Sequence, residues 1–262
     1  VGGLPDTPAA AWRVVCLDDT NRVAQTTNFF AIRNNPLDIY VALETMDLRE
    51  AVYVSASGAP DNWMATSNAP ISSLWTVFDR FDLEPGDCIW VDTGEYAEEE
   101  TIRIGMKNSG TAAHPVKITG NPEGPYTRSI VGGSRRGRDR AIELSRAGGV
   151  RLEAMAITNG WNGLAAVSNS TVELERVRIG MPRDLGLYCE NSSVSLTGCL
   201  LEGSAQAGLA ASTGATVTVR HSLMQNNAQN IRLAGSGASC DVRNSVLDAS
   251  GFGRFVYYFE SA

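Results

Sequence analysis

Three glutamates, Glu153, Glu173 and Glu175, are the residues of this sequence best suited to bind a metal ion. They occupy similar positions in two neighbouring apolar-rich segments, 150–153 and 172–175. Carboxylate oxygens are the ligands that Ca²⁺ prefers, and the ion takes about six to eight of them. If the two segments lie side by side, Glu153 falls over Glu175, and we predict a Ca²⁺ site. The alternative is a solvated face on which arginines screen these carboxylates. The candidate screening residues are Arg151, Arg176 and Arg178.

Arg220, His221 and Arg243 are the candidate catalytic bases. A base beside a cation-bound carboxylate can remove the proton α to that carboxylate. Arg220 and Arg243 also occupy equivalent positions in two segments. We therefore expect them to stack, about 10 Å from the glutamates, which corresponds to two strand spacings.

A third group of residues has the character of a glycan-binding surface. Arg135, Arg136 and Arg138 form a loop of dense positive charge, and Trp161 lies in a turn. Arginines can pair with acidic sugars, and an exposed indole can stack on a sugar ring. The alternatives are a solvated loop and a tryptophan that packs over the edge of the fold.

The elements that must position these residues come from a repeat between Val150 and Leu247. The same short apolar phrase recurs at steps of 22, 22, 23 and 23 residues. Its first residues are Val150, Val172, Val194, Val217 and Cys240. A second phrase runs in phase with the first, beginning at Gly163, Gly186, Gly208 and Asn230. This period and the in–out alternation predict stacked β-coils that share one continuous core.

A fixed turn position precedes each repeat and is occupied by Asn169, Asn191, Gly214 or Gly237. Asparagine and glycine tolerate a positive φ, so we expect a structural role in the turn. Asn169 and Asn191 also begin Asn-x-Ser/Thr patterns, but turn composition alone produces such patterns in a repeat of this kind.

The segment before the repeat supplies a leading β region and a helix. Apolar runs at 12–17 and 29–32 predict a hairpin-like pair, and this part (Asp18, Asn21 and Val23) resembles the end of immunoglobulin-like CARDB modules. Residues 72–82 place apolar side chains at helical spacing, with Ser72 or Ser73 as the candidate N-cap. We expect this helix to cover the open end of the coils.

The order of strand, loop, helix and Glu84-Pro85-Gly86-Asp87, followed by the spaced Ile89, Val91, Gly94 and Tyr96, resembles pectate-lyase-like right-handed β-helix proteins. It is most similar to β-helix modules of large bacterial surface proteins. The resemblance implies an all-β fold: a single-stranded right-handed parallel β-helix with a cap helix and a short leading β segment. The expected domains are residues 1–50 and 51–262, with seven or eight coils over about 87–250.

The composition and net charge restrict the classes of possible binding partners. The net charge is −7, which argues against nucleic acid or an anionic membrane surface as the main partner. We find no apolar run long enough for a transmembrane helix. The five cysteines lack CxxC spacing and are expected to be buried thiols.

Two classes of function remain. The first is an extracellular or cell-surface module of a larger protein, a structural or adhesive scaffold that contacts glycans, neighbouring domains or, end to end, a second copy. It requires no cofactor. Smooth repeats without long inserted loops favour this class. The rival, which the resemblance implies, is a polysaccharide lyase or uronate epimerase that acts with Ca²⁺ on an acidic polysaccharide.

Overall fold

The computed structural model describes residues 71–121, 129–133 and 139–248, together with the backbone of six further strands. The chain divides into two compact units, Val1–Leu37 and Asp38–Ala262. The expected domain boundary near residue 50 lies among residues that the structure does not describe. Within the described residues, no helix is both long and apolar enough to cross a membrane.

The first unit contains two antiparallel strand pairs. β2 (Arg13–Val15) pairs with β3 (Val23–Gln25), and β1 (Thr7–Ala10) pairs with β4 (Phe30–Ile32). The hairpin predicted from the apolar runs at 12–17 and 29–32 is therefore wrong in its partners. The second strand of the hairpin is the less apolar Val23–Gln25, because it is the strand that directly follows β2 in the chain.

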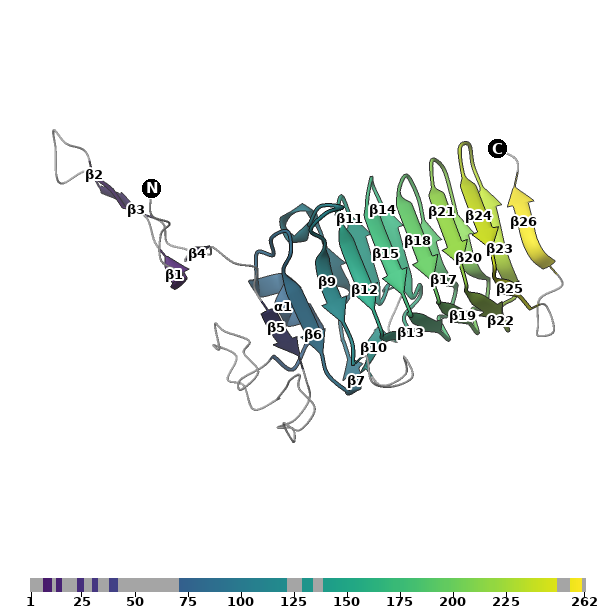
Figure 1. Cartoon of the computed structure of the whole chain (residues 1–262), viewed down its shortest axis with the longest axis horizontal. Coiled ribbons are helices and arrows are strands. Elements are labelled where there is room, and N and C mark those ends of the chain that lie inside the picture. The colour runs from purple at the N-terminus through teal and green to yellow at the C-terminus, as the bar shows by residue number, and fades with distance from the viewer. Residues whose placement is uncertain are drawn as a thin grey trace. The chain divides into compact units, whose positions relative to one another are not determined.

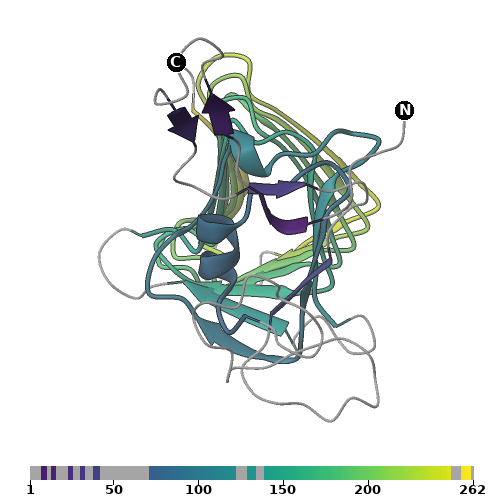
Figure 2. The same ribbon diagram turned by 90° about the vertical axis from the view of Figure 1, so that its left-hand side faces the viewer.

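The second unit is a three-sided parallel solenoid in which each coil contributes one strand to each of three sheets (Figures 1 and 2). Sheet 1 has eight strands: β5 (Asp38–Val41), β6 (Cys88–Val91), β9 (Val116–Thr119), β12 (Val150–Glu153), β15 (Thr171–Glu175), β18 (Ser193–Thr197), β21 (Thr216–Arg220) and β24 (Ser239–Arg243). Sheet 2 has seven: β7 (Gly94–Ala97), β10 (Ser129–Gly133), β13 (Ala156–Asn159), β16 (Arg178–Gly180), β19 (Leu200–Glu202), β22 (Leu223–Gln225) and β25 (Val246–Leu247). Sheet 3 also has seven: β8 (Ile102–Ile104), β11 (Ile142–Ser145), β14 (Leu164–Val167), β17 (Leu185–Cys189), β20 (Ala207–Ala211), β23 (Gln229–Ala234) and β26 (Phe255–Glu260). The sheets confirm the predicted parallel β-helix.

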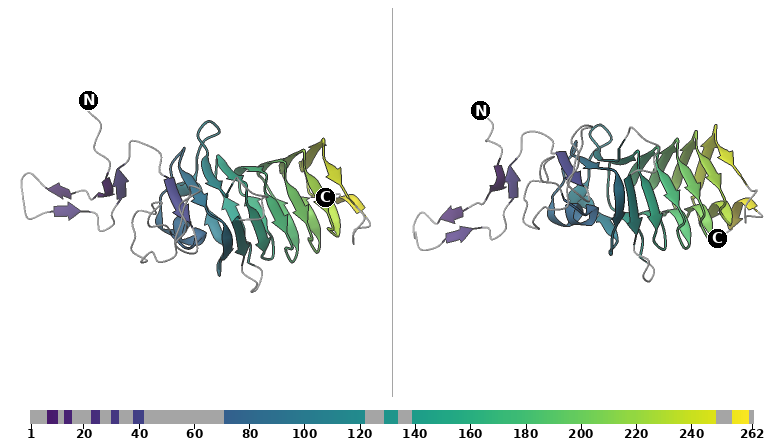
Figure 3. Two further views of the ribbon diagram at one scale, coloured as in Figure 1. Left: turned by 60° about the horizontal axis from the view of Figure 1, so that its bottom comes forward. Right: turned by 90° about the horizontal axis from the view of Figure 1, so that it is seen from below.

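The register of sheet 1 follows the sequence repeat residue by residue. Val150 pairs with Val172, then Val194, Val217 and Cys240. These side chains point inward, and the first four of them are 1% exposed. Every coil buries its apolar column against the next, so the core is continuous along the stack. Figure 3 shows how the coils are stacked.

Turns with a positive φ join the strands. The turns after β12, β15, β18, β21 and β24 each contain one such residue, namely Ala154, Arg176, Gly198, His221 and Asn244, with φ between 48° and 64°. The turn before sheet 1 has Asn169, Asn191, Gly214 and Gly237 in the same conformation, which confirms their predicted structural role. A left-handed residue helps the chain to change direction within the two residues after these strands and within the three or four residues before them.

Helix α1 (Leu74–Arg80) lies at the N-terminal end of the solenoid and buries Leu74, Val77 and Phe78 (Figure 2). The Ser73 hydroxyl is the N-cap and accepts a hydrogen bond from the Thr76 amide at 3.3 Å. The helix ends at Arg80, two residues before the predicted end, because the backbone becomes extended at Phe81. A short 3₁₀ helix, η2 (Met106–Asn108), follows β8.

Candidate functional site

The outer face of sheet 1 brings together the three predicted metal ligands, but it also places an arginine among them. Glu153 and Glu175 are register partners, as expected. The guanidinium of Arg151 lies 3.6 Å from Glu153 and 3.7 Å from Glu173, and it donates a hydrogen bond to Glu175. Arg176 lies 3.4 Å from the other Glu153 oxygen. The like charges that the repeat stacks are therefore neutralised by arginines from the same two coils.

This donor set does not fit the predicted Ca²⁺ site. Calcium needs several oxygens directed at one point, and here a guanidinium occupies the space between the carboxylates. In the described parts of the chain, no group of three or more His, Cys, Asp or Glu side chains is arranged to hold a metal ion. The arrangement instead matches the alternative of a screened face. Arg178 is not part of it, because Arg178 pairs with Glu202 at 2.6 Å on sheet 2.

The two candidate basic arginines are held by one carboxylate. Arg220 and Arg243 are register partners, and Asp241 lies between them. Arg220 donates to Asp241 Oδ2 at 2.6 Å and to the Asp241 carbonyl at 2.9 Å, while Arg243 Nε lies 3.1 Å from Asp241 Oδ1. These hydrogen bonds, that from Arg220 first, lower the pKa of Asp241. Both guanidiniums serve here as cationic partners, a role that opposes action as a base.

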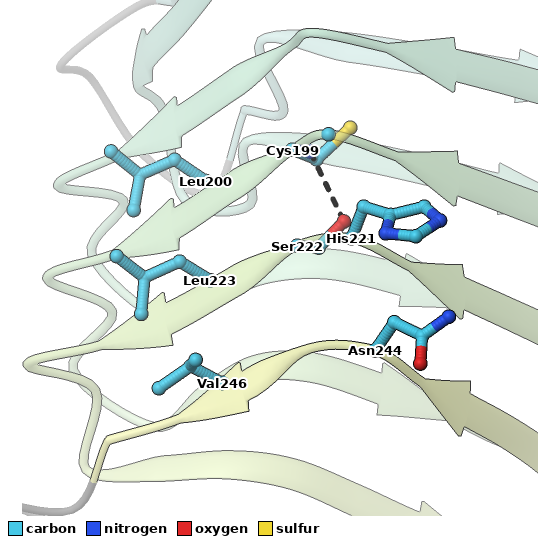
Figure 4. Close-up of a pocket in the computed structure, with 8 residues that line it drawn as sticks. Cys199, Leu200, His221, Ser222, Leu223, Asn244 and Val246 are labelled. Atoms are coloured by element: carbon cyan, nitrogen blue, oxygen red, sulfur yellow. Dashed lines mark hydrogen bonds between the residues drawn. The ribbon is translucent and has the colours of Figure 1, made fainter.

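His221, the third candidate base, lines an open depression of about 360 Å³ on the side of the last coils (Figure 4). The aliphatic side chains of Leu200, Leu223 and Val246 form one wall, and His221 and Asn244 form the other (Figure 4). His221 has a φ of 48°. The left-handed turn after β21 therefore directs the His221 side chain outward.

The hydroxyl and thiol beside this depression are not activated nucleophiles. Ser222 Oγ accepts a hydrogen bond from the Cys199 amide at 3.0 Å and donates to the Arg220 carbonyl at 2.7 Å. Burial raises the pKa of the Cys199 thiol to about 11, and its sulfur faces the Leu174 and Thr197 carbonyls. A nucleophile needs a base within hydrogen-bond reach, whereas both groups are bonded to main chain. The depression offers a binding surface and no catalytic pair.

Trp161, the predicted glycan contact, lies in the turn that leads into sheet 3. Its amide donates to the Asp139 carbonyl at 2.6 Å, and its carbonyl accepts from the Asp184 amide at 2.9 Å. The turn is thus fixed between the coils before and after it, and the indole is half-buried. The other predicted glycan residues, Arg135, Arg136 and Arg138, lie outside the described residues.

Tyr188, which the sequence analysis did not single out, is an aromatic side chain on the outer face of sheet 3. Its register neighbours are Ala165 and Ala210, so the ring lies between two small residues. The Arg140 guanidinium carbon is 6.0 Å from the ring centroid, and Arg140 also pairs with Glu143 at 2.9 Å. Burial first, and then the charge of Glu190, raise the pKa of the Tyr188 hydroxyl. The sequence did contain a signal for this residue. In the second phrase, the position after the leucine or isoleucine is occupied by Ala165, Tyr188, Ala210 and Arg232, and the tyrosine is the one aromatic residue among them.

We define the aromatic surface as Trp161, Arg140 and Tyr188, together with Glu143 and Glu190. It combines two half-buried rings with one cation and two carboxylates. Rings of this kind can stack on the apolar faces of sugars, while carboxylates and guanidinium bind hydroxyls. The surface therefore has groups that can bind a polyhydroxylated ligand.

The geometry defines the class of the chain. A three-sided stack of parallel strands with about 22 residues per coil is a parallel β-helix. Residues 130–247 match a protein-family model described as a right handed beta helix region. The chain therefore contains a right-handed parallel β-helix, as the resemblance implied.

Several solved structures are similar to the chain, at low sequence identity. A protein titled Geobacillus virus E2 ORF18 is 11% identical, with 70% of this chain and 41% of that chain covered and a TM-score of 0.48. Pectate lyase Pel9A is 15% identical, with coverage of 80% and 63% and a TM-score of 0.48. The pectin methylesterase from Aspergillus niger is 16% identical, with coverage of 75% and 83% and a TM-score of 0.48. The chain thus spans less than two thirds of the first two proteins. No curated protein matches the sequence.

Proposed function

We propose that this chain is a structural module of a larger secreted or cell-surface protein, and that its β-helix contacts glycans through the aromatic surface. The observation that carries the proposal is the position of Tyr188, an aromatic ring on an outer sheet face between two alanines. The ring is partly exposed, and an aromatic face can stack on the apolar face of a sugar.

The state of the candidate catalytic groups supports a scaffold over a lyase. Arg220 and Arg243 share Asp241, and the three glutamates surround Arg151. A lyase base must be free to accept a proton at the substrate, and its cation site must be open to the substrate carboxylate. Ion pairs between coils instead stabilise a rod-like stack, which suits a module that separates other domains.

The charges of Arg135, Arg136 and Arg138 favour an acidic glycan as the ligand. Residues 135–138 immediately precede Asp139 and Arg140 in the chain, and Asp139 is hydrogen-bonded to Trp161. In the sequence, Arg135, Arg136 and Arg138 lie two to five residues before Arg140 of the aromatic surface. An acidic glycan would gain ion pairs there, so the proposal specifies a polysaccharide with carboxylate or sulfate groups.

The test is a binding panel of acidic and neutral polysaccharides, read by titration calorimetry. We expect an acidic polysaccharide to bind, binding to weaken at least ten-fold in Tyr188→Ala, and binding to weaken in high salt. Met181→Ala is the matched control, because Met181 is 60% exposed and lies outside the aromatic surface. Equal binding by the wild type and by Tyr188→Ala would contradict a glycan site at the aromatic surface.

The same polysaccharides test the rival function. The unsaturated uronate that a lyase releases absorbs in the ultraviolet, so its formation is followed with and without Ca²⁺. Absorbance that rises with the wild type and is lost in Glu175→Ala or Arg220→Ala would establish a lyase and overturn the scaffold proposal. A flat trace from the folded protein is the expected result.

A further inference from the structure

The depression beside His221 has one aliphatic wall, which the repeat builds on the outer face of sheet 2. Leu200, Leu223 and Val246 are register partners on three successive coils, and we call them the aliphatic strip. Neighbouring strands lie about 4.8 Å apart, so the strip is about 10 Å long. All three side chains are at least partly exposed. Leu223 lies in a coil that has described coils on both sides, so the strip does not arise from the end of the stack.

The main-chain amides on the floor of the depression are already engaged. Those of Gly198 and His221 donate to carbonyls of the following coil. Those of Cys199 and Ser222 donate to serine hydroxyls at 3.0 and 3.1 Å. The polar groups that line the depression and face solvent are the side chains of His221 and Asn244, which point to the same side (Figure 4).

These two side chains suit the head of a carboxylate. An imidazole ring carries at least one N–H donor, and a primary amide carries two. His221 and Asn244 are equivalent turn residues of neighbouring coils, so their donors lie about one strand spacing apart and one carboxylate can accept from both. Arg220 and Arg243, which precede them in the chain, share the single carboxylate of Asp241. The excess of positive charge beside the depression also favours an anion.

We propose that the depression binds a small amphipathic carboxylate. The alkyl chain of this ligand lies along the aliphatic strip, and its head accepts hydrogen bonds from His221 and Asn244. Gly198, the equivalent turn residue in the preceding coil, has no side chain and leaves this end of the depression open. The site is separate from the aromatic surface on and beside sheet 3, so neither proposal depends on the other.

The chain contains two histidines, which makes proton NMR of the imidazole rings a direct assay. His221 reports on the depression, and the exposed His114 is the internal control. The spectrum of His221→Gly, which fits the turn as Gly198 does, assigns the signals. Titration of the full chain with octanoate should shift the His221 signals to saturation and leave those of His114 unchanged.

Two further probes separate the head of the ligand from its chain. Butyrate has four fewer methylene groups than octanoate and should bind at least about ten-fold more weakly, because each methylene that is buried raises the affinity about four-fold. Octan-1-ol keeps the chain but lacks the carboxylate, and it should also bind about ten-fold more weakly.

Variants of the chain test the two walls. Leu223→Thr interrupts the aliphatic strip at an outward strand position and should weaken octanoate binding about five-fold, and Asn244→Gly, which fits the positive φ, should weaken it several-fold. Met106→Ala is the matched control, because Met106 is 70% exposed and does not line the depression. Circular dichroism melting shows that each variant is folded. The proposal would be overturned by an unshifted His221, by equal shifts of both histidines, by equal affinities for octanoate and octan-1-ol, or by wild-type affinity in Leu223→Thr.

Discussion

The attachment of the cap helix to the first coil depends on one buried carboxylate, Glu98. It is 7% exposed and lies at the N-terminus of α1. Glu98 Oε1 accepts hydrogen bonds from the Leu74 amide at 2.7 Å and the Trp75 amide at 3.4 Å, and Oε2 accepts one from the Ser73 hydroxyl at 2.7 Å. The carboxylate thus satisfies amides that a helix start leaves without intrahelical partners.

Replacing Glu98 with alanine removes these acceptors and leaves the Leu74 amide buried. An unsatisfied buried donor costs about 1–3 kcal/mol, and loss of a helix N-terminal acceptor costs about 0.5–2 kcal/mol. The two costs overlap, so we expect Glu98→Ala to lower the free energy of unfolding by about 3 kcal/mol. Glu98→Gln keeps one acceptor oxygen and should cost about half as much.

Urea denaturation measures the global loss, and amide hydrogen exchange locates it. Because coils contact only their neighbours, release of the cap should accelerate exchange in β6, β7 and β8 while β17 and β20 stay protected. Glu99→Ala is the matched control, since Glu99 is the next residue and is exposed. If Glu98→Ala and Glu99→Ala unfold with the same free energy, the carboxylate does not hold the cap and the reasoning is wrong.

Three further predictions concern the core, an ion pair and a turn. Leu174→Ala should lower the free energy of unfolding by about 2–5 kcal/mol in urea, because Leu174 is 1% exposed between two other coils. The pKa of Asp241 is lowered in the folded state, so its ionised form stabilises the fold above the unfolded pKa of about 3.9. This stability is lost as the pH falls through the lower folded pKa. Acid unfolding of Arg220→Gln should therefore begin at a higher pH than that of the wild type. His221→Val should lower the melting temperature and His221→Gly should not, because a φ of 48° is strained for a β-branched residue.

The repeat was predictable from sequence because each coil follows the same geometry as its neighbours. Once Val150 and Val172 are aligned, the spacing fixes which residues pair, and Glu153 over Glu175 and Arg220 over Arg243 follow. The turn at Asn169 was predictable from its residue type. The turn at Ala154 and Arg176 was not, since neither residue type favours the left-handed conformation that both adopt.

Side-chain contacts between residues that the repeat does not relate could not be predicted from the sequence. Glu98 and Leu74 are 24 residues apart, and no repeat relates them. Arg178 was assigned to the glutamate face by proximity in sequence, yet the turn after β15 carries it to sheet 2 and Glu202. Tyr188 could not be predicted for a different reason: its register neighbours are Ala165 and Ala210, and a repeat pattern marks only the residue types that recur.

The ion pairs of the outer faces give a physical reason to look for function where the repeat changes. A coil whose charges are matched by its neighbours, as Arg151 is by Glu173 and Glu175, has little left with which to bind an external charged group. Departures from the repeat are different, because the neighbouring coils carry no residue of the same type beside them. Tyr188 on sheet 3 is such a departure, since both of its register neighbours are alanines. We therefore expect substitutions at Tyr188 to change binding while leaving stability almost unchanged, and substitutions in the ion-paired columns to do the reverse.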